Sequence, residues 1–175
     1  RLLVIEDSSE LKIKTDHVVF FETKPADVMG KGQITIRDLI RSALRLRPDR
    51  IIVGEVRGPE ALDLITAMNT GHGGSMGTTH ANTPYDALVR LETLAMMGDT
   101  QVPVAAIRRQ IAAAIHLVVQ IKRLNDGSRK VTHISEVIPD VDDSGRYIIR
   151  DIYQFVQRGM TAEGKIVGEL IPVGY

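Results

Sequence analysis

The chain has 175 residues, of which 43% are hydrophobic, so it can form one domain with a hydrophobic core and is not a disordered segment. Its 22 lysines and arginines balance its 22 aspartates and glutamates, which leaves no net field to attract nucleic acid or an anionic membrane. The absence of cysteine excludes disulfides, a thiol nucleophile and cysteine-based zinc sites. No apolar run reaches about 18 residues, so we expect no membrane-spanning helix.

The first predicted element is a strand at 2–5, an apolar run that is closed by Glu6 and Asp7. Together with Glu10 these residues place three carboxylates within five positions. Such a group is either a solvated junction between strand and turn or a cluster that positions magnesium or its bound water. The chain begins inside this strand pattern without an initiator methionine or a signal peptide, so we expect it to be an excised piece of a longer protein.

A second strand is expected at 17–23, and a helix follows that is capped by Thr35. Three arginines recur every fourth residue on this helix and therefore share one flank: Arg37, Arg41 and Arg45. An arginine row of this kind is either a solvated face or an edge that faces an anion, because guanidinium groups pair with phosphate oxygens.

The stretch around which the chain is organised covers residues 49–82. An apolar run at 51–53 is typical of a buried parallel strand and ends at Glu55. A helix and a glycine-rich turn lead to a second short strand at 75–79, which ends at His80. Both strands are expected to place polar groups at the carboxyl edge of an open α/β sheet, where ligands bind.

The remaining chain predicts two helices and then a set of half-exposed strands. Thr83 caps a helix that runs to about Met97, and Pro103 starts the next one. Alternating apolar and polar residues then predict strands at 117–124, 129–138, 147–156 and 165–171. We therefore expect an α/β core over residues 1–116 and an antiparallel β meander over residues 117–175.

Taken together, these polar groups favour phosphoryl transfer. This reaction needs a carboxylate to orient water, cations for the developing charge and a polar sensor near the γ-phosphate. Glu55 suits the first role, and His80, beside Thr79, suits the third, although a lone histidine can equally be structural. The cations could come from Arg37, Arg41, Arg45 or Arg57.

Three rival motifs fit less well. His72 and His80 lack metal-ligand spacing, so a metal hydrolase is not expected. Residues 73–77 read GGSMG, but this serine enters a strand, whereas a hydrolase nucleophile enters a helix. No segment matches the phosphate-binding pattern G-x-x-x-x-G-K-S/T. Residues 159–165 come close, but Ile166 replaces the hydroxyl and a strand follows.

Three segments resemble motifs of the secretion ATPase superfamily, which serves type II and type IV secretion and pilus assembly. Residues 4–11 resemble its Asp box, residues 47–58 its Walker B motif and residues 70–82 its His box, in the right order and at the right spacing. The most similar branch assembles tight-adherence (Flp) pili. The resemblance implies a RecA-like P-loop NTPase core with an antiparallel β extension, whose P-loop segment lies upstream of Arg1.

By this resemblance Glu55 activates the attacking water and His80 contacts the γ-phosphate region of ATP. Glu6 and Glu10 match Asp box carboxylates that organise Mg²⁺ and water, with Asp7 and Glu55 as further indirect partners of the metal. We also expect Arg57 to be one of the catalytic residues and Thr79 to be one of the nucleotide-binding residues. The arginine finger is expected among Arg37, Arg41 and Arg45.

The resemblance also implies a cytoplasmic homo-hexamer that works at inner-membrane platform proteins without direct contact to nucleic acid. A conjugative DNA-transfer motor of the same superfamily is the nearest alternative, and the balanced charge favours a protein cargo over it. A non-catalytic ring or regulatory module is a second alternative, which Glu6, Glu55 and His80 argue against. Without P-loop amides and lysine, we expect the chain alone to be close to inactive and its parent to be an ATPase.

Overall fold

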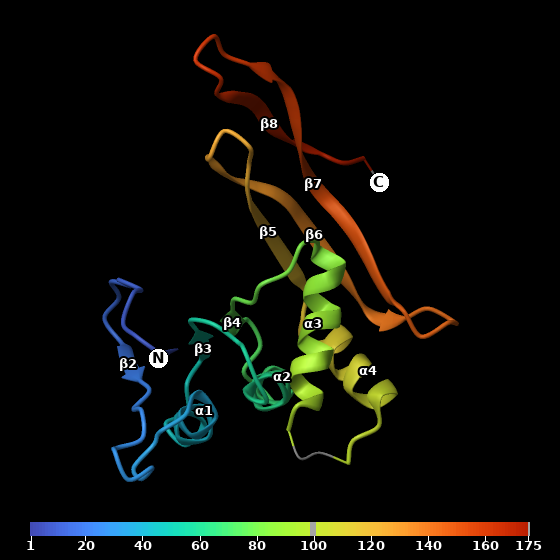
Figure 1. Cartoon of the computed structure of the whole chain (residues 1–175). Helices are drawn as coiled ribbons and strands as arrows, with labels where there is room; N and C mark the ends of the chain where they lie inside the picture. Colours follow the sequence, from blue (N-terminus) through green and yellow to red (C-terminus); the bar gives the residue numbers. More distant parts are fainter. Residues whose placement is uncertain (99–100, 175) are drawn as a thin grey trace.

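The computed structural model describes residues 1–98 and 101–174. Two four-stranded sheets organise these residues, and the second sheet projects away from the α/β part of the chain (Figure 1). The mixed α/β fold with an antiparallel C-terminal extension is therefore confirmed. The expected meander runs to Tyr175, which lies outside the described residues.

The first sheet has the strand order β2-β1-β3-β4, and every neighbouring pair is parallel. Its strands are β1 (Leu2–Glu6), β2 (Val18–Glu22), β3 (Arg50–Val53) and β4 (Met76–Gly77). The two inner strands, β1 and β3, are the apolar runs of the sequence. In β1 all residues from Leu3 onwards are buried. All four strands therefore end at the same edge of the sheet.

Within the described residues, four helices accompany the sheets: α1 (Ile36–Leu44), α2 (Glu60–Asn69), α3 (Pro84–Met96) and α4 (Val104–Ala114). Thr35 caps α1 through a reciprocal pair of hydrogen bonds with Asp38, and Thr83 accepts the backbone N–H of Asp86 at the start of α3. The helix starts that the sequence predicts at these two threonines are confirmed.

The second sheet is antiparallel, in the order β5-β6-β7-β8. Its strands are β5 (Leu117–Arg123), β6 (Arg129–Val141), β7 (Tyr147–Met160) and β8 (Ile166–Pro172). The β6 and β7 strands continue past the expected residues 138 and 156, because pairing resumes across irregularities in the ladder. Gly127 and Gly145 adopt positive φ angles of 81° and 74° in the hairpin turns, as the sequence pattern predicts.

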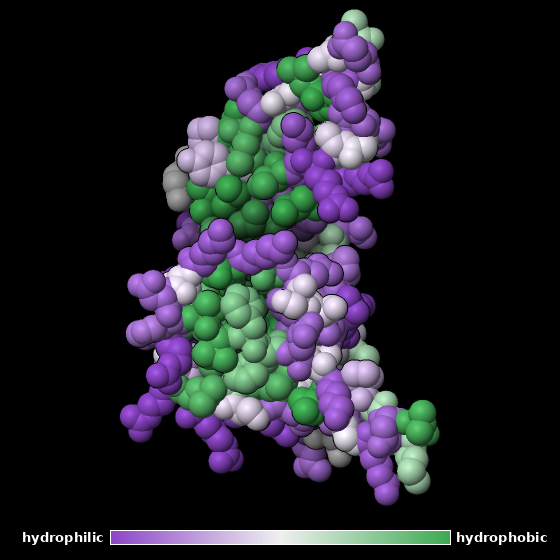
Figure 2. All heavy atoms as spheres, turned by 90° about the vertical axis from the view of Figure 1, so that its left-hand side faces the viewer, coloured by the Kyte–Doolittle hydropathy of each residue, from purple (hydrophilic) through white to green (hydrophobic). Residues whose placement is uncertain are grey.

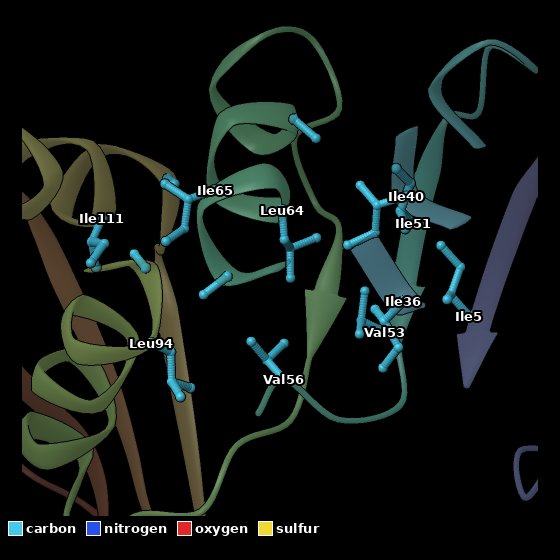
Figure 3. Packing of buried hydrophobic residues seen from close by; sticks show 14 of the residues in the cluster. Ile5, Ile36, Ile40, Ile51, Val53, Val56, Leu64, Ile65, Leu94 and Ile111 are labelled. Carbon is cyan, nitrogen blue, oxygen red and sulfur yellow. The ribbon is translucent and has the colours of Figure 1, made fainter. Parts of the chain in front are cut away.

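One hydrophobic core joins the first sheet to the helices and to the base of the second sheet. Figure 3 shows α2 in the middle of it: Leu64 points toward the first sheet and Ile65 toward Ile111 of α4. The same cluster includes Val137 and Tyr147 of the second sheet. This continuous packing holds the carboxyl edge of the first sheet at a set position relative to β5 and β6.

The alternation along β5 places apolar side chains on the outside. Leu117, Val119 and Ile121 have exposed fractions of 51%, 50% and 59%. Val118 and Gln120, which alternate with them, are half-buried. These two side chains lie on the side of the sheet that faces the core. Figure 2 shows apolar side chains gathered over the second sheet, in the upper half of that view. Exposed apolar surface of this kind is typical of interaction sites.

The strand that the sequence predicts at 75–79 is shorter than expected, with Met76 and Gly77 alone in β4. Beyond Gly77 the ladder is replaced by a contact in which the N–H of Val56 donates to Thr78 O at 2.8 Å. No helix in the described part of the chain is long and apolar enough to cross a membrane.

Candidate functional site

Polar side chains from separate strands meet at the carboxyl edge of the first sheet. Glu6 ends β1, Glu55 lies two residues after β3, and His80 lies three residues after β4. The parallel pairing of β1 with β3 and of β3 with β4 brings these three strand ends side by side. The expected common edge is therefore present.

Glu55 is the centre of this group, with 20% of its side chain exposed. Its Oε1 lies 3.0 Å from Nε2 of His80, and its Oε2 accepts a hydrogen bond from the Arg57 guanidinium. Asp7 approaches Arg57 from the other side, at 3.8 Å between Oδ2 and Nη1. The hydrogen bond from Arg57, and then the charges of Arg57 and His80, hold the pKa of Glu55 below its ordinary value. The carboxylate is thus charged and oriented at neutral pH.

The loop that carries His80 is fastened to the loop that carries Glu55. The Thr78 hydroxyl donates to Gly54 O at 2.5 Å, and the Thr79 hydroxyl donates to Val56 O at 3.2 Å. The His80 side chain itself is 89% exposed, so its backbone and not its own packing determines where it lies. Thr79, expected at the nucleotide, is a loop anchor in this structure.

Glu6 lies under the same edge with 5% exposure. Its Oε1 accepts the backbone N–H groups of Glu10 at 3.2 Å and Leu11 at 3.1 Å, so it shapes the loop after β1. A Cβ added to Gly54 would lie 2.9 Å from the Cγ of Glu6, a distance too short for any side chain there. Gly54 therefore makes room for Glu6 directly beside the backbone of Glu55.

The described residues contain no group of three or more His, Asp or Glu side chains that could hold a metal ion directly. Asp7 accepts the Thr23 hydroxyl at 3.2 Å and also faces Arg57. The Glu10 side chain is exposed, and only its backbone N–H contacts Glu6. The indirect magnesium role of Glu6, Asp7 and Glu55 thus stays a prediction.

Two of the three arginines on α1 bind a partner that the sequence pattern did not reveal. Arg37 donates through Nε to Oδ2 of Asp63 at 2.7 Å, and Arg41 donates through Nε to Oδ1 at 3.0 Å. Asp63 lies on α2, with 16% of its side chain exposed. Arg45 is exposed at the C-terminal end of α1 and forms no side-chain hydrogen bond or ion pair with the residues that the structure describes. None of the three contacts Glu55.

Ser75 of the GGSMG segment has a structural role in the glycine-rich turn. Its hydroxyl donates to His72 O at 2.7 Å and accepts the backbone N–H of Ile51 at 2.9 Å. Ile51 is fully buried in β3, so the serine hydroxyl satisfies a donor that water does not reach. This geometry agrees with the rejection of a serine hydrolase.

Replacing Ser75 with alanine is expected to lower the free energy of unfolding by about 1–3 kcal/mol, because the Ile51 N–H loses its acceptor. Urea denaturation of both proteins measures the change. Ser144→Ala is the matched control, since Ser144 is exposed in the β6–β7 turn. Equal unfolding midpoints for Ser75→Ala and the unsubstituted chain would contradict the structural role.

Comparison with known proteins identifies the family. The model of the type II/IV secretion system protein family matches residues 1–161. The chain is 43% identical over 135 residues to a putative conjugal transfer protein of Mycobacterium tuberculosis, which covers 77% of this chain and 38% of the relative. It is 40% identical over 136 residues to the conjugal transfer protein TrbB of Rhizobium radiobacter, covering 77% and 39%.

Among solved structures, the VirB11 ATPase of the Brucella suis type IV secretion system superposes with a TM-score of 0.67 at 31% identity. The match covers 77% of this chain and 39% of the VirB11 chain. The chain thus spans about two fifths of the length of the relatives that it matches. The resemblance seen in the three sequence motifs is confirmed at the level of the superfamily: the chain belongs to the type II/IV secretion system protein family.

Proposed function

We propose that this chain carries the water-activating part of an ATPase that powers type II or type IV secretion. The observation that supports it best is the Glu55 carboxylate, which is held between the Arg57 guanidinium and the His80 imidazole at the carboxyl edge of a parallel sheet. The likeness to a VirB11 ATPase at 31% identity supports the same activity.

The donor set at this edge fits the terminal phosphate of ATP and a hydrated magnesium ion, because it combines carboxylate oxygens with oriented cations. Glu55, Glu6 and Asp7 would hold Mg²⁺ through its water shell, and Arg57 and His80 would contact the terminal phosphate. When bound, Mg-ATP supplies the phosphoryl group and neutralises part of its charge.

Each residue of the site then has a defined role. Glu55, whose pKa is lowered, stays ionised and accepts a hydrogen bond from the attacking water. Arg57 and His80 stabilise the negative charge that develops on the phosphoryl oxygens. Of the candidate arginine fingers, Arg45 is the one without an ion-pair partner among the described residues, whereas Arg37 and Arg41 are bound to Asp63.

We expect Mg-ATP to bind tightly only when a phosphate-binding P-loop from the longer protein is present, because the 175 residues contain no such motif. Calorimetry on this chain and on a version extended at its N-terminus measures the difference. The extended version should bind Mg-ATP and hydrolyse it, and this chain should do neither.

The control is the extended version with its P-loop lysine replaced by alanine, which should bind as weakly as this chain. Binding by this chain with an affinity equal to that of the extended version would contradict the assignment. The turn at 159–165 would then become the candidate phosphate site.

The proposal extends to a homo-hexamer in the cytoplasm that contacts inner-membrane platform proteins. The tight-adherence pilus branch is the one that the sequence resembles most, and the balanced charge favours a protein cargo. A second candidate is a conjugative DNA-transfer motor, which is supported by the names of the relatives at 43% and 40% identity. Salt-dependent DNA binding by the longer protein is the measurement that separates the two.

A further inference from the structure

The β5 strand contains an irregularity close to the site. Gln120 pairs with His133, but the next residue, Ile121, pairs with Val131, so β6 has one residue more than β5 at this point. Such β-bulges redirect side chains and are frequent beside functional sites. The extra residue, Thr132, donates its hydroxyl to Gln120 O at 3.3 Å and so fastens the bulge.

At this bulge a polar side chain points toward the core side of the sheet. Gln120 is half-buried, whereas its neighbours Val119 and Ile121 are 50% and 59% exposed. The position before it on the same face, Val118, packs against the hydrophobic core. An amide in such a position requires a hydrogen-bond partner, because an unpaired buried polar group is costly.

That partner belongs to the His80 loop. The Gln120 side-chain N–H donates to Ala81 O at 3.0 Å, across 39 positions of sequence. Ala81 directly follows His80 and lies just before the start of α3. On its other side the same loop is fastened by the Thr79 hydroxyl to Val56 O, next to Glu55.

We infer that Gln120 is a positioning residue, which holds the His80 loop from the side of the second sheet so that the imidazole faces Glu55. Because the His80 side chain is 89% exposed, backbone contacts on both sides of the residue replace packing as the means of orienting it. The expected effect on ATP hydrolysis rests on the proposed function, whereas the orientation of the His80 loop by Gln120 does not depend on that function. Gln120 also connects the second sheet to the site.

The test substitutes Gln120 with methionine, which keeps the length of the side chain and removes the donor. In NMR spectra of this chain, the nuclear Overhauser effect between the His80 ring protons and the Glu55 side-chain protons should be lost. In the longer protein, kcat for ATP hydrolysis should fall about tenfold, and the KM for ATP should change less than about twofold.

Gln154→Met is the matched control, because Gln154 is an exposed glutamine on β7 of the same sheet. It should keep both the Overhauser effect and kcat. Gln120→Glu is a second variant of nearly equal size, to be used if Gln120→Met does not fold. Its carboxylate would face Ala81 O without a donor, so the Overhauser effect should again be lost and kcat should again fall.

The outcomes separate the two levels of the proposal. An unchanged contact between His80 and Glu55 in a folded Gln120→Met or Gln120→Glu protein would overturn the positioning role. Loss of that contact, in a longer protein that hydrolyses no ATP even before substitution, would support the positioning role and refute the proposed function.

Discussion

Glu55→Gln in the longer protein should lower kcat for ATP hydrolysis on the order of 1,000-fold, because an amide cannot accept the proton of the attacking water. The substitution keeps the shape of the side chain, and its oxygen can still accept from Arg57. The fold should therefore survive. Steady-state hydrolysis and thermal unfolding, measured on the same preparation, give the two quantities.

Glu22→Gln is the matched control, because Glu22 ends β2 at the same edge of the sheet and is exposed. The same chemical change there should leave kcat within about twofold of the unsubstituted value, since Glu22 contacts the backbone of Ser9 and not the Glu55 group. Unchanged hydrolysis by Glu55→Gln would contradict the assignment of Glu55 as the water-activating residue, and an absence of hydrolysis in the unsubstituted protein would favour the non-catalytic ring module.

Arg108→Met is expected to cause the largest loss of stability, about 3 to 5 kcal/mol. Arg108 forms a two-pronged ion pair with Glu92, at 2.7 and 2.6 Å, and donates to Gly145 O at 2.7 Å. The Tyr147 hydroxyl completes the group by donating to Glu92 at 3.0 Å. Removing the cation leaves the Glu92 carboxylate, which is 8% exposed, without its charge partner.

This effect should depend on pH in a defined direction. The hydrogen bonds from Arg108, and less strongly that from Tyr147, lower the pKa of Glu92 from its ordinary value of 4.5. A carboxyl with a lowered pKa stabilises the fold above the unfolded-state value, and this contribution disappears as the pH falls through the folded-state value. The difference in unfolding free energy between the two proteins should therefore narrow below about pH 4.5.

Urea unfolding at pH 7 and at acidic pH measures both quantities. Arg158→Met is the control, since the Arg158–Glu169 pair on β7 and β8 is 58% and 60% exposed and should contribute little. Equal destabilisation by the two substitutions would contradict the central role of the Glu92 group in joining α3, α4 and the β6–β7 hairpin.

Much of the site could be read from local patterns. Thr35 and Thr83 mark helix starts because their hydroxyls cap backbone N–H groups a few residues away. Ile51 and Val53 of the apolar run are buried, and the polar residues that follow this run and β4 lie at one edge, because parallel strands end on the same side. The catalytic roles assigned to these residues stay predictions that the substitutions above examine.

The partners of the polar side chains could not be read in this way, because they depend on how distant elements pack. Arg37 and Arg41 meet Asp63 only because α1 and α2 pack side by side. The burial along β5 could not be read from its residues either, since the apolar Val119 is 50% exposed, whereas the polar Gln120 is half-buried and donates to Ala81 O. Local residue order sets where a strand or helix forms and ends, whereas the contacts of Gln120 and Asp63 arise from the three-dimensional path of the chain, which a short segment does not encode.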